Sequence, residues 1–108
     1  SGYTTLIGLL ATPIKHTSSP KMHNEAFRHL GLDYAYVAFD IKVEEVKAAL
    51  DAMRLFHMRG CNVTMPCKTE AAKYMDELSP AARIIGAVNT IVNEDGKLIG
   101  QVVAELCK

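Results

Sequence analysis

Hydroxyl, amide and amino side chains gather at three places along the chain, each next to an apolar, strand-like segment. They are Thr17 and Ser19, then Asn62, Thr64 and Lys68, and finally Asn89. In parallel α/β sheets, ligands bind beyond the carboxyl ends of the strands, so these groups are expected to face one cleft. Such a set suits a small molecule that carries hydroxyl or carboxylate groups better than an apolar one.

Each of these positions also has an ordinary structural explanation. Thr17 and Ser19 precede Pro20, where their hydroxyls and the free N–H groups of a following helix would bind an anion, but Ser19 can equally be a simple helix cap. Lys68 falls in the first turn of a predicted helix, where a cation opposes the helix dipole; it is either a general acid or base or a solvated surface lysine. Asn89 interrupts an apolar strand, so its amide needs either a ligand hydroxyl or a neighbouring loop as partner.

The elements that must position these groups alternate between strand-like and helix-like patterns. This order predicts a three-layer α/β/α sandwich with a mainly parallel sheet and an antiparallel hairpin near the C-terminus. We expect strands at 4–10, 33–39 and 60–64, helices at 19–30, 43–54, 66–75 and 79–85, and a hairpin of 87–93 with 97–103. The segment 33–39 is apolar on both of the faces that alternate along a strand, which predicts a strand covered on both sides.

Composition excludes several classes of function. Lysine plus arginine and aspartate plus glutamate are both 12 in 108 residues, so a basic surface for nucleic acid or anionic lipid is not expected. No apolar run reaches the roughly 20 residues of a membrane span, and the sequence does not open with a charged and then apolar segment, so we expect neither a membrane span nor a signal peptide. The three cysteines and four histidines lack metal-site spacing, which favours reduced thiols in a single cytoplasmic domain without a metal.

Three motifs in this order resemble a known family. They are GLLATPIKHTSSP at residues 8–20, NVTMPCK at 62–68 and GAVNTIV at 86–92. Together they are similar to the amino-terminal substrate-binding domain of the shikimate/quinate dehydrogenases. The resemblance implies reduction of the ring ketone of 3-dehydroshikimate, or of a quinate relative, with hydride from NADP or NAD, in chorismate and aromatic amino acid biosynthesis or in quinate metabolism.

The resemblance also assigns roles by position. Thr17 and Ser19 would hold the substrate carboxylate, whereas Asn62, Thr64 and Asn89 would bind ring hydroxyls. Lys68 would hydrogen-bond the reacting hydroxyl and help to move its proton, which agrees with the need of a developing alkoxide for a positioned donor.

Two departures from the family pattern stand out. Thr17 replaces the first serine of the usual serine–x–serine pair, and its added methyl group leaves the choice between shikimate and quinate open. Ala104 stands where the family has an aspartate that partners the lysine, and the adjacent Glu105 is not assigned that role because a shift of one residue usually turns a side chain elsewhere.

The seven glycines include no Gly-x-Gly-x-x-Gly fingerprint, so we expect the NAD(P)-binding Rossmann domain to be absent and no cofactor to bind to this chain alone. A truncated or naturally shortened substrate domain that is inactive by itself is the first hypothesis. A non-catalytic module that binds shikimate or quinate is the second. The third is a structural remnant that self-associates as a homo-oligomer through a surface that a second domain would cover.

Overall fold

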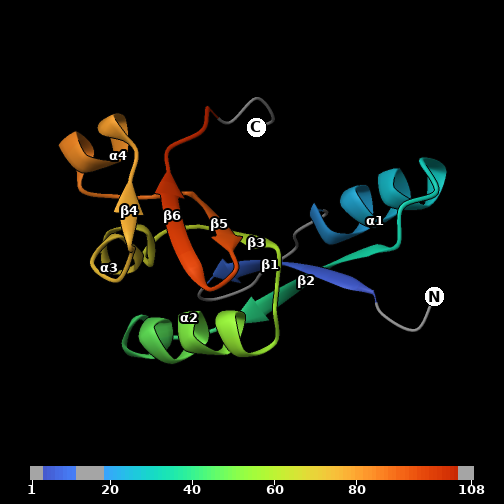
Figure 1. The fold of residues 1–108 in the computed structure, drawn as a ribbon, viewed down its shortest axis with the longest axis horizontal. Helices are drawn as coiled ribbons and strands as arrows, with labels where there is room; N and C mark the ends of the chain where they lie inside the picture. The colour runs from blue at the N-terminus through green and yellow to red at the C-terminus, as the bar shows by residue number, and fades with distance from the viewer. Residues whose placement is uncertain (1–3, 12–18, 105–108) are drawn as a thin grey trace.

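The computed structural model describes residues 4–11 and 19–104, which form one six-stranded sheet and its flanking helices (Figure 1). In chain order the elements are β1 (Thr5–Ala11), α1 (Ser19–His29), β2 (Tyr34–Asp40), the 3-10 helix η1 (Val43–Glu45), α2 (Val46–Leu55), β3 (Gly60–Val63), α3 (Lys68–Ala72), β4 (Glu77–Leu78), α4 (Pro80–Ile85), β5 (Thr90–Glu94) and β6 (Lys97–Gln101). None of the helices in these ranges has both the length and the apolar character needed to cross a membrane.

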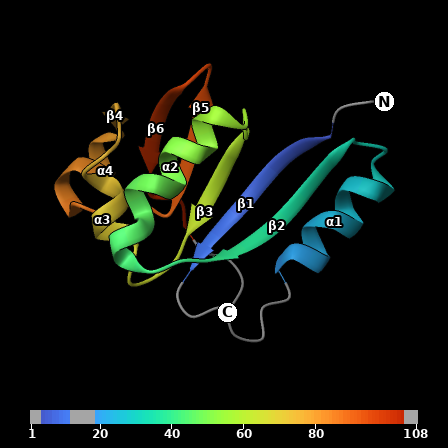
Figure 2. The ribbon, with the colours of Figure 1, turned by 90° about the horizontal axis from the view of Figure 1, so that it is seen from below.

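The strands lie in the order β2-β1-β3-β5-β6-β4. β1 pairs in parallel with β2 and with β3, and β4 pairs in parallel with β6, whereas β5 is antiparallel to both β3 and β6. Five strands therefore run in one direction and β5 runs against them. Helices α1 and α2 lie on opposite faces of this sheet (Figure 2). The predicted α/β/α architecture, with its mainly parallel sheet and C-terminal hairpin, is confirmed.

Two apolar clusters lie on the two faces of the sheet. The larger one joins α2, α3 and α4 to the sheet and includes the fully buried Leu50, Ile91 and Leu98. The smaller one lies under α1 and is built from Leu9, Ala11 and Tyr36, with Phe27 packed against it. Because successive strand residues point to opposite faces, β1 contributes Leu10 to the larger cluster and Leu9 to the smaller one.

The prediction that β2 is covered on both sides is wrong. Its face toward α1 is shielded, and Tyr36 is buried, but Val37 and Phe39 on the other face are 38% and 37% exposed. The reason is the strand order, because β2 is the edge strand and α2 covers this face of it only in part. Its free edge is instead closed by the Asn24 side chain of α1, which accepts from Tyr36 N at 2.7 Å and donates to Tyr36 O at 3.0 Å.

The hairpin and the last helix follow their local sequence signals. Ser79 caps α4 through its hydroxyl, which accepts from Ala82 N at 3.2 Å, and Gly86 ends that helix with φ 76°. Asp95 and Gly96 form the β5–β6 turn with φ 52° and 94°, which is the left-handed backbone that a two-residue hairpin turn requires.

The predicted helix at 66–75 is shorter in the structure. Pro66 lies in the turn before α3, and α3 covers only Lys68–Ala72. The helix does not continue to residue 75 because the chain turns toward β6, where Asp76 N donates to Leu98 O at 2.9 Å. The next residues form β4, at the far edge of the sheet. β4 was not predicted, since two residues carry no recognisable strand pattern.

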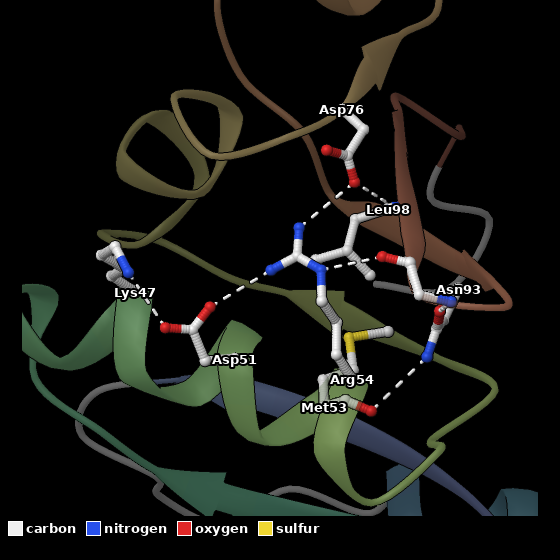
Figure 3. Close-up of polar contacts among 8 residues, drawn as sticks. Lys47, Asp51, Met53, Arg54, Asp76, Asn93 and Leu98 are labelled. Carbon is white, nitrogen blue, oxygen red and sulfur yellow. Dashed lines mark hydrogen bonds and ion pairs between the residues drawn. The ribbon is translucent and has the colours of Figure 1, made fainter.

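Arg54, near the end of α2, ties this helix to the hairpin (Figure 3). Its Nε donates to Gly96 O at 2.8 Å, and its two terminal nitrogens pair with Asp51 and Asp76 at 3.2 Å each. Asp76 also accepts from Leu98 N at 2.7 Å. This backbone hydrogen bond, and then Arg54, hold the pKa of the Asp76 carboxyl below its usual range. The network fixes the hairpin relative to α2 and so fixes the far half of the sheet.

Candidate functional site

Asn62 lies on β3 near the carboxyl end of the strand and turns its amide toward the α1 side of the sheet. Its Oδ1 accepts a hydrogen bond of 2.9 Å from the hydroxyl of Tyr36, which belongs to β2. Its Nδ2 contacts Thr90 Oγ1 at 3.4 Å and Asn89 O at 3.5 Å, both at the outer limit for a hydrogen bond. The carbonyl end of the amide is thus firmly held, and the amino end is the end that can turn to a ligand.

Asn89 precedes β5 and is only 9% exposed. Its Oδ1 accepts from Val103 N at 2.8 Å and from Thr90 Oγ1 at 3.0 Å, and its Nδ2 donates to Val103 O at 2.6 Å. The buried amide therefore has a neighbouring segment as its partner, which is the ordinary explanation that the sequence left open. An amide nitrogen carries two donors, so Nδ2 has a second N–H besides the one that it donates to Val103 O.

Thr64 and Lys68 are brought to the same place by the backbone. Thr64 follows β3, and both its N–H and its hydroxyl point to Leu10 O, at 3.0 and 3.4 Å. Lys68 is the first residue of α3, and its carbonyl accepts from Val88 N at 3.1 Å, one residue before Asn89. Val63 N donates to Asn89 O at 2.9 Å. The structure thus brings Asn62, Thr64, Asn89 and the backbone of Lys68 together at the carboxyl end of β3.

The first predicted pair lies largely outside the described residues. Thr17 falls in the segment 12–18, of which the structure says nothing, and Ser19 is described only as the first residue of α1. Helix α1 is nevertheless linked to the rest of the site, because Asn24 in the middle of that helix holds the backbone of Tyr36 and Tyr36 holds Asn62.

Tyr36 is the member of this cluster that the sequence analysis missed. Its ring stacks on His23 at a centroid distance of 4.3 Å and an interplanar angle of 12°. Burial, and secondarily the neighbouring Cys61, raise the pKa of Tyr36 to about 12, so its hydroxyl stays a proton donor at neutral pH. The available signal was a tyrosine within an apolar strand, because a buried phenol hydroxyl needs a partner.

The chemistry that this arrangement can perform is binding of hydroxyl groups by the amides of Asn62 and Asn89 and by the hydroxyl of Thr64. Within residues 4–11 and 19–104, no three His, Cys, Asp or Glu side chains are grouped so that they could hold a metal ion. Burial raises the pKa of the Cys61 thiol to about 12, which makes it a packing residue and not a nucleophile.

Comparison with known proteins decides the family. A family model described as the shikimate dehydrogenase substrate binding domain matches residues 9–91. The chain belongs to this family. The match spans all six predicted site positions, from Thr17 to Asn89, and includes Tyr36. The resemblance drawn from the three motifs is confirmed.

Relatives of this substrate-binding domain agree with the assignment. The chain is 56% identical over 102 residues to the NADP(+) shikimate dehydrogenase of Listeria monocytogenes and 58% identical over 104 residues to that of Streptococcus uberis. In both cases the match covers 94% of this chain and 35% of the relative. The chain therefore spans about a third of the length of the curated relatives that it matches.

Solved structures of the family have the same fold. Shikimate 5-dehydrogenase from Listeria monocytogenes, in complex with shikimate and NAD, superposes with a TM-score of 0.88 at 56% identity, over 94% of this chain and 35% of that one. A ligand-free 5-ketofructose reductase from Gluconobacter superposes with a TM-score of 0.90 at 29% identity, over 94% of this chain and 37% of that one.

Proposed function

We propose that this chain is the part of an NADP-dependent shikimate dehydrogenase that binds shikimate or 3-dehydroshikimate. One observation carries the proposal: Tyr36, Asn62, Thr90 and Asn89 form a hydrogen-bonded chain at the carboxyl end of β3, next to the start of α3. The support from similarity is a relative, 56% identical, whose structure contains shikimate and NAD.

The roles follow from which polar atoms remain available. Asn62 offers its weakly engaged Nδ2, Asn89 one N–H of its amide, and Thr64 the lone pairs of its hydroxyl; these groups would bind ring hydroxyls. Thr17, which precedes α1 in the sequence, and Ser19, the first residue of α1, would hold the carboxylate, because free helix N–H groups and hydroxyls favour an anion.

Lys68 would hydrogen-bond the reacting oxygen and transfer its proton. Its main chain is fixed on both sides, since Cys67 N donates to Thr64 O at 2.9 Å and the Lys68 carbonyl accepts from Val88 N. The fixed backbone supports this role, because it would hold the amine of Lys68 within reach of a ring that the neighbouring amides orient.

The nicotinamide cofactor would be held by other residues. The fingerprint that cradles a dinucleotide pyrophosphate is not present among the seven glycines of this chain, so no step involving hydride is assigned to these residues. We therefore expect the 108-residue chain to bind the substrate without oxidising it. The extra methyl group of Thr17 leaves the choice between shikimate and quinate open.

Calorimetric titration of the chain with shikimate and with quinate tests this function. We expect saturable heat at millimolar ligand, since half a cleft leaves much of the ligand in contact with water. Lys68→Ala should weaken binding severalfold. Lys73→Ala is the matched control, because Lys73 also belongs to the α3 region but is exposed and paired with Glu70 at 3.0 Å.

Two results would contradict the proposal. The absence of heat with both ligands, in a chain that unfolds cooperatively, would exclude the binding role. Equal binding by the Lys68 and Lys73 variants would exclude Lys68 from the site. In a separate assay, reduction of NADP with shikimate by the chain alone would show that the expected lack of turnover is wrong.

A further inference from the structure

An apolar cavity of about 220 Å³ lies between α2 and the sheet. Its nine lining residues all carry aliphatic, aromatic or sulfur-containing side chains. Leu10 of β1 and Cys61 of β3 line it from the sheet, and Ala49 and Ala52 line it from α2. Two alanines at this contact leave the space that larger side chains would fill.

This cavity is separate from the candidate site. β3 turns Cys61 toward α2 and the next residue, Asn62, toward Tyr36 and the α1 side, because successive strand residues point to opposite faces. Leu10 and Leu9 are divided between the two apolar clusters in the same way. A ligand with several hydroxyl groups does not suit the cavity, since the lining side chains offer it no strong hydrogen-bonding partner.

The cavity meets the molecular surface at two phenylalanines. Phe56, just after α2, is 64% exposed and Phe39 of β2 is 37% exposed, yet both line the cavity. Together with Met53 and Met58 they offer aromatic edges and thioether sulfurs, which contact aromatic rings favourably. Burial keeps the Cys61 thiol protonated by raising its pKa, so the lining carries no charge.

We propose that this cavity binds a small, uncharged aromatic molecule built on one six-membered ring. An apolar cavity of about 150 Å³ is enough for benzene, and such cavities exclude water for lack of polar partners. The volume of about 220 Å³ here admits one ring with a short alkyl substituent. This site does not depend on the proposed shikimate site.

Titration of the chain with benzene, followed through the methyl groups of methionine by NMR, tests the proposal. Met53 and Met58 line the cavity, so their methyl resonances should shift and saturate together. The other methionines, Met22, Met65 and Met75, do not line the cavity and serve as internal controls. Shifts in all five that grow linearly, or no shift in Met53 and Met58, would overturn the proposal.

A pair of variants provides a second test. Ala52→Leu places a larger side chain in the cavity and should weaken benzene binding at least tenfold. Ala48→Leu makes the same change at an exposed position of α2 and should leave the affinity within twofold. Equal affinity in both variants would show that benzene binds elsewhere, whatever the methyl shifts of the unchanged chain.

Discussion

The substitution Tyr36→Phe tests the contact on which the site depends. It removes one hydroxyl, which donates to Asn62 Oδ1 at 2.9 Å, and leaves the ring that stacks on His23. We expect the variant to keep the fold, to be less stable, and to bind shikimate more weakly, because the amide of Asn62 loses the contact that fixes its orientation.

The magnitude follows from the geometry of the pair. A neutral hydrogen bond contributes about 1 kcal/mol net, and an acceptor left unsatisfied in the interior costs up to about 3 kcal/mol. Asn62 is only partly buried, so water can replace the phenol and the lower value applies. A loss of about 1 kcal/mol lowers the melting temperature of a domain of this size by roughly 4–8 °C. If the same free energy is lost on binding, Kd rises about fivefold.

Tyr34→Phe is the matched control, followed by thermal unfolding and by calorimetry with shikimate. Tyr34 lies on the same strand and its ring contacts Phe27 edge-on at 5.4 Å, but its hydroxyl has no hydrogen bond to any residue that the structure describes. Its removal should change stability by less than about 0.5 kcal/mol. If the two variants unfold and bind alike, Tyr36 does not hold Asn62, and the site as described here is wrong.

Three further predictions concern stability and reactivity. Arg54→Met should lower the free energy of unfolding in urea by about 1–2 kcal/mol, because it removes two hydrogen bonds from α2 to its neighbours and one within α2. Lys47→Met, which removes only an exposed pair with Asp51, should have little effect, and equal losses would refute the role of the network. The thiol of Cys61 should resist iodoacetamide at pH 8 in the folded chain and react after unfolding, as read by peptide mass spectrometry; labelling of the native state would contradict its burial. Stability should fall as the pH rises from 9 to 12, since Cys61 and Tyr36 ionise near 9.0 and 10.0 when unfolded but near 12 when folded; a flat profile in that range would contradict both raised pKa values.

Local signals predicted most of the fold because they depend only on neighbouring residues. The hydroxyl and proline at Ser79 and Pro80 start α4, and Asp95-Gly96 forms the hairpin turn. The errors arose where tertiary structure decides. The exposure of Val37 follows from the edge position of β2, which no local pattern reveals, and the early end of α3 follows from the hydrogen bond between Asp76 and Leu98.

The candidate site was predicted only in part, for a related reason. The sequence indicated that the amide of Asn89 needs a partner, but the partner is the backbone of Val103, 14 residues away. Tyr36 was missed because its own partner, Asn62, is 26 residues further along the chain and two strands away in the sheet. Residue types and motifs indicate which groups bind, whereas the groups that position them come from distant strands.

Tyr36 connects two parts of the site because it reaches across β1. The register sets Tyr36 of β2 opposite Ile7 of β1, and Asn62 of β3 opposite Leu9 of β1. The Tyr36 side chain therefore spans the width of β1, since β2 and β3 are about 10 Å apart. Asn24 of α1 holds the backbone at Tyr36 on the outer edge. Tyr36 therefore joins α1, whose first turn would bind the carboxylate, to Asn62, whose amide would bind ring hydroxyls. It follows that a displacement of α1 along β2 should also change the orientation of the Asn62 amide.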